Sequence, residues 1–344
     1  MRPLESPADV AVVRCADIDA AIAELTHEQG YRLDMIMPAD QPRVAELSRG
    51  GERIRLEMDA IEPAPPDLPD HGGFLLTRAG AQADWTLGRA GMRYRDLIPG
   101  RLGGRFIGSH ICIPDGGPVA DYVHYHQVRF QLIYCLRGWV RVVYEDQGEP
   151  FVLHPGDCVL QPPTIRHRVL EASDGLEVLE IGGPAEHPTF REHALDLPTT
   201  RRQPARRYGG QGFVRHVAAE AHWLPSARAG LEYRDTGVAQ ATDGFADARV
   251  FRALPSDVSV QLRAVVACPD DCALFFVHVL AGELTLLDGG VGTPVLGAGD
   301  SCVVPTGADF SFAVGPGCEF LQVSVQCDGL ADATTRGGSQ RRVW

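Results

Sequence analysis

Three histidines with regular spacing are the residues of this sequence best suited to chemistry. His124 and His126 lie two positions apart, and His167 follows a turn at Gly156. Side chains at positions i and i+2 of a strand point to the same face, so both imidazoles can meet one ion. A third imidazole from a later strand would leave coordination positions open, which is typical of a catalytic rather than a structural metal site.

The residues around these histidines match two spaced motifs. The first motif is His-x-His, followed after four residues by a position that is usually Glu and after six more residues by Gly. It runs here from His124 to Gly138. The second is Gly, five residues and PxGxxH, and it runs from Gly156 to His167. These are the motifs of the cupin family, which the sequence resembles, although Gln131 replaces the usual Glu and Thr164 replaces a Gly. The resemblance implies a jelly-roll barrel with His124, His126 and His167 as metal ligands.

The replacement at position 131 changes the predicted charge of the site. With three neutral imidazoles and no carboxylate, a divalent ion would keep its charge of +2 and favour a small anionic, chelating substrate. Gln131 could ligate weakly through its carbonyl or hydrogen-bond bound water or O₂, and we favour the second role. Tyr122 is a second catalytic candidate, because strand alternation places it on the face of His124 and His126; a core tyrosine is the alternative.

Four further residues are weaker candidates. His110 could support the site as a hydrogen-bond partner or a fourth imidazole, or could be a core histidine. The cations nearest to a substrate carboxylate in the sequence are Arg105, Arg129 and Arg137. Each of these arginines could equally be a solvated surface charge.

Three-histidine cupin sites are similar to those of ferrous dioxygenases that cleave gentisate-like rings or diketones, or that oxidise thiols. The resemblance therefore implies a metal-dependent dioxygenase with O₂ as co-substrate. Fe(II) is the favoured metal, and Zn, Ni, Cu and Mn stay open because ligand type alone does not choose among them. Two alternatives remain: a non-redox isomerase, lyase or cyclase, and a protein that binds or senses a small molecule without turnover.

Composition limits the class of protein. A net charge of −13 argues against nucleic acid or an anionic membrane as a partner, since both require a basic surface. Nine scattered cysteines without a CxxC pair, and the lack of an apolar leader or a span of about 18 apolar residues, predict a cytoplasmic protein. The 38 glycines and 25 prolines favour many short strands joined by turns.

The second half of the chain repeats the first at an offset of 143 or 144 residues. The matching pairs are Gly138 with Gly282, Gly156 with Gly299, and Pro162 with Pro305. By the same offsets, His124 and His126 map to Cys268 and Asp270. His167 maps to Phe310, and Gln131 maps to Phe275. We therefore predict two antiparallel barrels in tandem, of which the second is a metal-free scaffold.

The first 60 residues differ from both barrels. A strand, a helix that begins after Asp17, and three further strands give a βαβββ order, which resembles a half-module of the glyoxalase-type (vicinal oxygen chelate) fold. Glu57 occupies a ligand position of that fold, but the first strand has no histidine, so a structural or dimerising role is predicted. A lone half-module leaves an edge or face that a partner subunit or a barrel must cover, and we predict a homodimer. The predicted units are residues 1–60, a linker at 61–75, the first barrel at 76–196, and a linker with the second barrel at 197–344.

Overall fold

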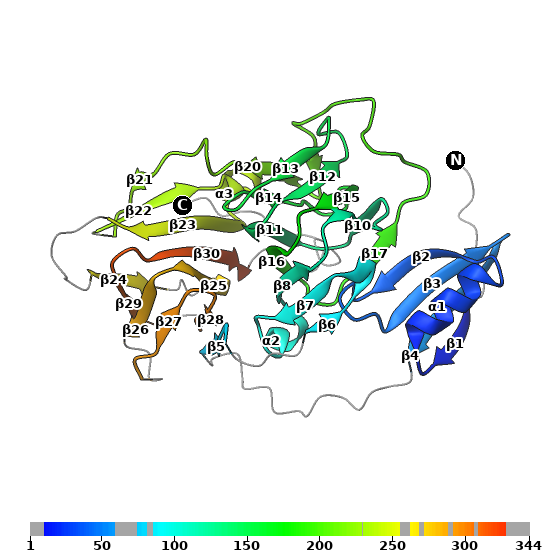
Figure 1. The fold of residues 1–344 in the computed structure, drawn as a ribbon, viewed down its shortest axis with the longest axis horizontal. Coiled ribbons are helices and arrows are strands. Elements are labelled where there is room, and N and C mark those ends of the chain that lie inside the picture. Colours follow the sequence, from blue (N-terminus) through cyan, green and yellow to red (C-terminus); the bar gives the residue numbers. More distant parts are fainter. Residues whose placement is uncertain are drawn as a thin grey trace, which may run out of the picture.

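The computed structural model describes residues 10–58, 74–80, 85–228, 230–254, 262–267, 272–287, 292–305 and 309–327. The protein is mainly β, with two antiparallel jelly-roll barrels in tandem and a small N-terminal module, as predicted. In Figure 1 the N-terminal module is blue, the first barrel runs from cyan to green, and the second barrel runs from yellow to red apart from its one cyan strand, β5 (Leu75–Thr77).

The N-terminal module has the predicted βαβββ order. Its elements are β1 (Ala11–Cys15), α1 (Ile18–His27), β2 (Arg32–Met37), β3 (Val44–Arg49) and β4 (Glu52–Met58). The Asp17 side chain accepts a hydrogen bond from the Ala20 amide at 2.9 Å and so caps α1 as the sequence predicted. Strand β1 pairs in parallel with β4, and the sheet order is β1-β4-β3-β2. The likeness of this module to the glyoxalase-type fold stays a prediction.

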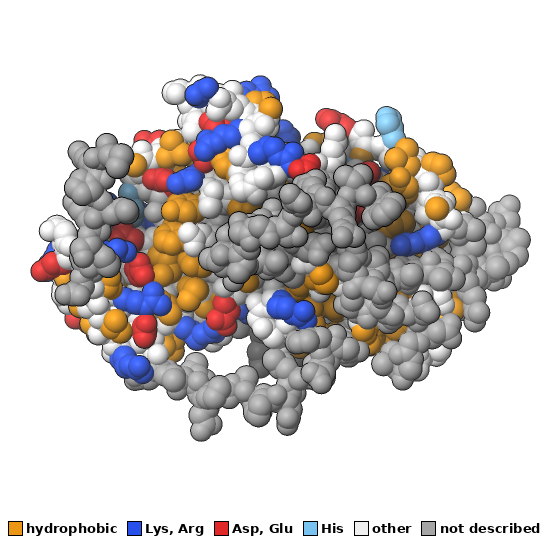
Figure 2. Space-filling model, turned by 180° about the vertical axis from the view of Figure 1, so that it is seen from behind, with side chains coloured by type: hydrophobic (Ala, Val, Ile, Leu, Met, Phe, Trp, Pro, Cys, Tyr) orange, Lys and Arg blue, Asp and Glu red, His pale blue; other side chains and the backbone are white. Residues whose placement is uncertain are grey.

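Ion pairs cover part of this module's sheet. Glu46 pairs with Arg53 and Arg55, and Glu57 pairs with Arg55 at 2.8 Å. Side chains of both charges are interspersed on the part of the molecule that holds this module (Figure 2). Glu57 therefore contacts an arginine and belongs to no cluster of three metal-ligating side chains within the described residues.

Two facing sheets build the first barrel. One sheet has the strand order β20-β14-β11-β16-β8-β7-β6, and the other continues the N-terminal sheet as β17-β10-β15-β12-β13, with β9 on β15. The strands are β6 (Thr86–Leu87), β7 (Arg93–Asp96), β8 (Ile107–Ile113), β9 (Gly117–Pro118), β10 (His124–His126), β11 (Phe130–Arg137), β12 (Val140–Tyr144), β13 (Phe151–Leu153), β14 (Cys158–Leu160), β15 (His167–Ala172), β16 (Leu176–Gly183), β17 (Thr189–Arg191) and β20 (Val214–His216). Two short helices, η1 (Arg89–Gly91) and α2 (Arg101–Gly104), flank β7.

The second barrel repeats this plan. Its sheets have the orders β21-β22-β23-β30-β25-β28-β5 and β24-β29-β26-β27. The strands are β5 (Leu75–Thr77), β21 (Leu224–Pro225), β22 (Leu231–Asp235), β23 (Ala246–Ala253), β24 (Leu262–Ala267), β25 (Cys272–Ala281), β26 (Glu283–Leu287), β27 (Val295–Gly297), β28 (Ser301–Val303), β29 (Asp309–Val314) and β30 (Glu319–Gln326). Helix α3 (Val238–Ala241) precedes β23, and the hairpin of β18 (Arg207–Tyr208) and β19 (Gln211–Gly212) lies between the barrels in the sequence.

The barrels exchange one strand in each direction. Strand β5, which precedes the first barrel, pairs with β28 of the second, and β20, which precedes the second barrel, pairs with β14 of the first. The predicted domain boundaries at 75/76 and 196/197 stay predictions; the first falls within the exchanged strand β5, and the second precedes the exchanged strand β20.

One apolar cluster joins the barrels, while each barrel also has its own interior. The shared cluster includes Phe106, Phe130 and Leu132 of the first barrel, and Phe276, Leu321 and Val323 of the second. Burial of these large side chains makes the two barrels one packed body. Among the described helices, none is long and apolar enough to cross a membrane.

The free edge that suggested a homodimer is paired within the chain. Strand β2 of the N-terminal module pairs with β17 of the first barrel, with Ile36 opposite Thr189. The barrel therefore covers the β2 edge, and the homodimer stays a prediction without that support.

Candidate metal centre

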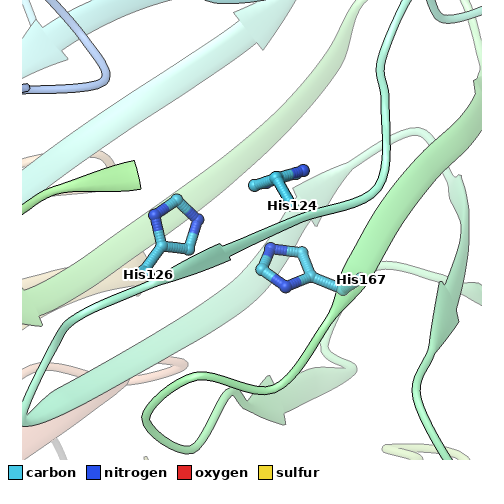
Figure 3. A group of neighbouring side chains, drawn as sticks. All are labelled: His124, His126 and His167. Carbon is cyan, nitrogen blue, oxygen red and sulfur yellow. The ribbon is translucent and has the colours of Figure 1, made fainter. Parts of the chain in front are cut away.

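The three histidines come together from two neighbouring strands. His124 and His126 lie on β10, and His124 pairs directly with His167 at the start of β15. Their potential ligand atoms all lie within 4.8 Å of one another. Figure 3 shows the rings gathered at one point between these strands. The side chains are buried, with exposed fractions of 1%, 7% and 5%, so local strand alternation and one cross-strand pair together form the cluster.

A hydrogen bond fixes each ring through its Nδ1 atom. His124 Nδ1 lies 2.8 Å from the Tyr122 carbonyl oxygen, and His167 Nδ1 lies 3.0 Å from that of Ile165. A carbonyl oxygen only accepts, so both Nδ1 atoms carry the proton and Nε2 carries the lone pair. His126 Nδ1 lies 2.8 Å from Thr189 Oγ1. Such partners are usual for metal-bound histidines, and the three residues therefore fit a divalent ion.

The histidines line a cavity of about 100 Å³ inside the first barrel. Most of its wall is apolar, contributed by residues such as Met92, Ile111, Val140 and Leu176. No Arg or Lys is among the described residues that line it. Apolar walls limit competing water and strengthen electrostatic interactions at the ion.

Gln131 also lines the cavity and belongs to a chain of polar side chains. Its Nε2 donates to Glu180 Oε1 at 2.5 Å, and its Oε1 accepts from Gln161 Nε2 at 2.9 Å. Gln161 Oε1 in turn accepts from the Tyr144 hydroxyl at 2.5 Å, and Gln161 Nε2 lies 3.5 Å from His167 Nε2. Gln131 is therefore oriented by protein neighbours on both ends of its amide. Its predicted role toward water or O₂ stays a prediction.

Glu180 is the residue that the sequence argument missed. We predicted three imidazoles and no carboxylate around the ion, and the cluster of potential ligands holds only the three histidines, but Glu180 on β16 lines the same cavity. It lies opposite Ile133 in the β11–β16 pairing and is half-buried. A charged residue between Leu179 and Ile181 of an apolar strand was the available signal. The polar wall of the cavity thus holds a carboxyl group beside Gln131.

Tyr122 lies beside the site rather than on its strand. Strand β10 begins at His124, so the predicted alternation does not extend to Tyr122. Its ring makes an edge contact with His124 at 5.9 Å, and the Arg191 guanidinium lies 4.6 Å from its ring centre. Tyr122 is not among the described residues that line the cavity. Its backbone carbonyl orients His124, and a catalytic role of its phenol stays a prediction.

The weaker candidates lie elsewhere. Arg105, Arg129 and Arg137 are outside the set of described cavity-lining residues, and Arg137 lies 3.6 Å from Glu177. His110 Nε2 lies 3.0 Å from the same Glu177. Burial lowers the pKa of His110. His110 and Arg137 instead line a cavity between the two barrels.

Aromatic side chains occupy the equivalent positions of the second barrel. Phe275 and Phe310 are each 3% exposed, and their rings pack edge to face at 5.6 Å. Phe310 pairs with Val266, as His167 pairs with His124. The counterpart of His124 is therefore Val266 and not Cys268, because the segment between the paired strands is longer in the second barrel. Cys268 and Asp270 lie outside the described residues.

Comparison with known proteins agrees with this architecture. Residues 109–182 match the family model described as "Cupin domain", and this segment contains the three histidines, Gln131 and Glu180. A search of the curated proteins gives no match.

Three solved structures illustrate the likeness of fold. The oxalate decarboxylase of Lactobacillus farciminis is 12% identical with a TM-score of 0.52, and the match covers 73% of this chain and 86% of that one. Protein Ylba from E. coli is 12% identical with a TM-score of 0.50, covering 74% and 92%. A deletion mutant of Bacillus subtilis oxalate decarboxylase is 13% identical with a TM-score of 0.50, covering 75% and 80%. At these identities the matches establish the fold alone.

Proposed function

We propose that the first barrel is the active site of a metal-dependent enzyme for a small, metal-chelating metabolite, with dioxygenation as the favoured reaction. The observation that carries this proposal is the set of three buried imidazoles, each hydrogen-bonded through Nδ1, inside one apolar cavity. Three neutral nitrogen ligands leave positions for a chelating substrate and O₂, which is the requirement of a mononuclear oxygenase.

His124, His126 and His167 would hold the ion through Nε2. A divalent ion, with Fe(II) favoured and Zn, Ni, Cu or Mn open, would supply Lewis-acid or redox chemistry there. Tyr144, Gln161 and Gln131 form a hydrogen-bonded wall that fixes polar groups next to His167. The apolar side chains around them exclude water from the reacting groups.

Charge supports a small anionic substrate. The ion would contribute +2 and ionised Glu180 would contribute −1, so the cavity would keep a net positive charge. A carboxylate or enolate would neutralise that charge, while its apolar remainder would contact the apolar walls. Position 131 alone therefore does not set the charge of the site, because Glu180 contributes to it.

Glu180 favours a second candidate, a non-redox lyase. A half-buried carboxylate that lines the cavity could take up and return a proton during bond cleavage. The likeness of fold to two oxalate decarboxylases is compatible with this alternative. Binding or sensing of a small molecule without turnover is the third candidate.

Metal content and oxygen consumption separate these candidates. Protein purified without a chelator or a nickel column should contain one metal per chain by mass spectrometry. It is then incubated with small keto acids, hydroxy acids, diketones and dihydroxybenzoates in the presence and absence of air. Oxygen uptake equal to substrate loss supports the dioxygenase, and turnover without oxygen supports the lyase. Binding without turnover of any compound contradicts the enzyme proposal and supports the sensor.

Glu180→Gln sharpens the choice between the two reactions. A lyase that uses this carboxylate for proton transfer should lose about 100-fold or more in kcat, in line with the usual contribution of a general acid or base. A dioxygenase that uses Glu180 only to orient Gln131 should change far less. Retained metal content in the variant is the control that its site is intact.

A further inference from the structure

The N-terminal module reaches the metal cavity of the first barrel. Ala39, in the segment between β2 and β3, lines that cavity together with Met92 and Tyr94. Among the described lining residues, Ala39 alone comes from the N-terminal module. A part of the chain that carries none of the three metal-ligating histidines thus completes the wall around them.

Two contacts clamp this segment onto the barrel. Asp40 is 6% exposed and forms an ion pair with Arg101, which also contacts Asp96 at 3.3 Å. On the other side the Asp40 carbonyl packs against Gly88, where an added Cβ would lie 2.7 Å from that oxygen and 2.6 Å from the Tyr94 ring. A buried charge such as Asp40 is costly unless its partner stays in place, so the pairing with Arg101 favours one position of the segment.

Strand pairing links the same module to a metal-ligating histidine. Ile36 of β2 lies opposite Thr189 of β17, and Thr189 lies opposite His126 of β10. The hydroxyl of Thr189 is also the partner of His126 Nδ1. The module is therefore fixed relative to the metal centre through two consecutive strand pairs, and Ala39 is held at a constant place in the cavity wall.

We propose that the N-terminal module is a fixed wall of the active-site cavity and that the side chain at position 39 sets the size of the molecule that binds beside the metal. This inference rests on the proposed metal-dependent function. Its physical basis is space: leucine in place of Ala39 would add three carbon atoms to a cavity of about 100 Å³. Atoms forced into such a space displace a ligand or strain the wall.

Two chelators of different size test the proposal on cobalt-loaded protein. Acetohydroxamate and benzohydroxamate present the same metal-binding group, and their binding is followed by the visible absorption of Co(II). In Ala39→Leu, benzohydroxamate should bind at least about tenfold more weakly, equivalent to about 1.4 kcal/mol. Acetohydroxamate should change by less than about twofold, because it is smaller.

A matched control variant and a variant with the opposite expected effect on chelator affinity complete the test. Ala23 is an exposed residue of α1, and Ala23→Leu should leave both affinities unchanged. Ala39→Gly removes a methyl group from the wall and should strengthen benzohydroxamate binding by about threefold relative to acetohydroxamate.

Three results are decisive. Equal changes for both chelators in Ala39→Leu, or no change for either, would overturn the role of position 39. If Ala39→Leu fails to fold, Ala39→Gly decides, and unchanged selectivity in it also overturns the proposal. Failure of the wild-type protein to bind cobalt contradicts the proposed metal centre instead, so the two failures are distinguishable.

Discussion

The two barrels share a strand plan but differ at corresponding positions of their interiors. In the first, His124 pairs with His167 beside a cavity, and Gln131 contacts Glu180. In the second, the partner of Val266 is Phe310, which packs against Phe275. The jelly-roll barrel accepts either set of side chains. It requires only that inward-facing positions be filled by packed apolar groups or occupied by polar groups that form hydrogen bonds.

This difference shows that the polar side chains suited to chemistry lie in the first barrel, while the second barrel holds packed apolar side chains at the matching positions. Buried polar groups are costly unless hydrogen-bonded, and the first barrel satisfies its imidazoles with two carbonyls and a threonine hydroxyl. At the positions of His167 and Gln131 the second barrel has the close-packed rings of Phe310 and Phe275, which stabilise by burial. The exchanged strands β5 and β20 and the shared apolar cluster connect this packed barrel to the first one.

The largest expected effect is the loss of metal from the first barrel alone. His126→Ala removes one of three imidazole ligands and should reduce bound metal to less than about one tenth of an equivalent. His278→Asn, at a buried histidine of the second barrel, should keep one full equivalent. Mass spectrometry of metal after dialysis measures both. A full equivalent in His126→Ala would disprove the assignment of this histidine.

The next effect is on stability and should appear in the second barrel. Phe310→Ala empties a position that is 3% exposed and should cost about 3–5 kcal/mol of unfolding free energy. Its counterpart in the first barrel, His167→Ala, should remove metal at a smaller cost in stability. Chemical denaturation of the metal-depleted proteins gives the comparison. If Phe310→Ala is close to neutral in stability, the second barrel is not the packed scaffold that we describe.

A pH effect should follow from the second barrel's buried histidine. Burial lowers the pKa of His278 to about 3, helped by His110 and Arg95. The unfolded chain takes up this proton near pH 6.5, so stability is present above that pH and is lost as pH falls toward 3. The loss should reach up to about 3 kcal/mol at pH 4.5.

His278→Asn provides the comparison for that pH effect. Asparagine does not titrate, so the variant should lose less stability than the wild type between pH 7 and pH 4.5. Urea denaturation at the two pH values measures the difference. Parallel losses in the two proteins would assign the acid sensitivity to other groups, such as His110 and His216, whose pKa values burial also lowers.

The smallest effect should come from the hydrogen-bond partner of a ligand. Thr189→Val keeps the shape of the side chain but removes the oxygen that contacts His126 Nδ1. Metal affinity should fall by about 10–100-fold. Competition with a chromophoric chelator measures the affinity, and Thr200→Val at an exposed position is the control. Unchanged affinity in Thr189→Val would show that this hydroxyl does not orient the ligand.

The sequence by itself determined the metal cluster and the duplicated β architecture. Alternation places His124 and His126 on one face, and spaced motifs, with turns such as Gly156 at φ of 92°, bring in His167 and recur at a nearly fixed offset. The helix boundary at Asp17 follows from local capping in the same way. Strand alternation and helix capping are predictable because each involves residues that are close in the chain, whereas the place of His167 was predicted from motif spacing.

Only the tertiary structure decided which distant residues complete the site. Glu180 and Thr189 lie on strands whose partners are remote in the sequence, and Ala39 lies in the segment after β2, which pairs with the distant β17. A residue of the second barrel, Val266, became the counterpart of His124 because a longer connection shifts the register. Strand pairing between remote segments depends on the summed packing of the whole barrel and on loop lengths, and no local pattern specifies it.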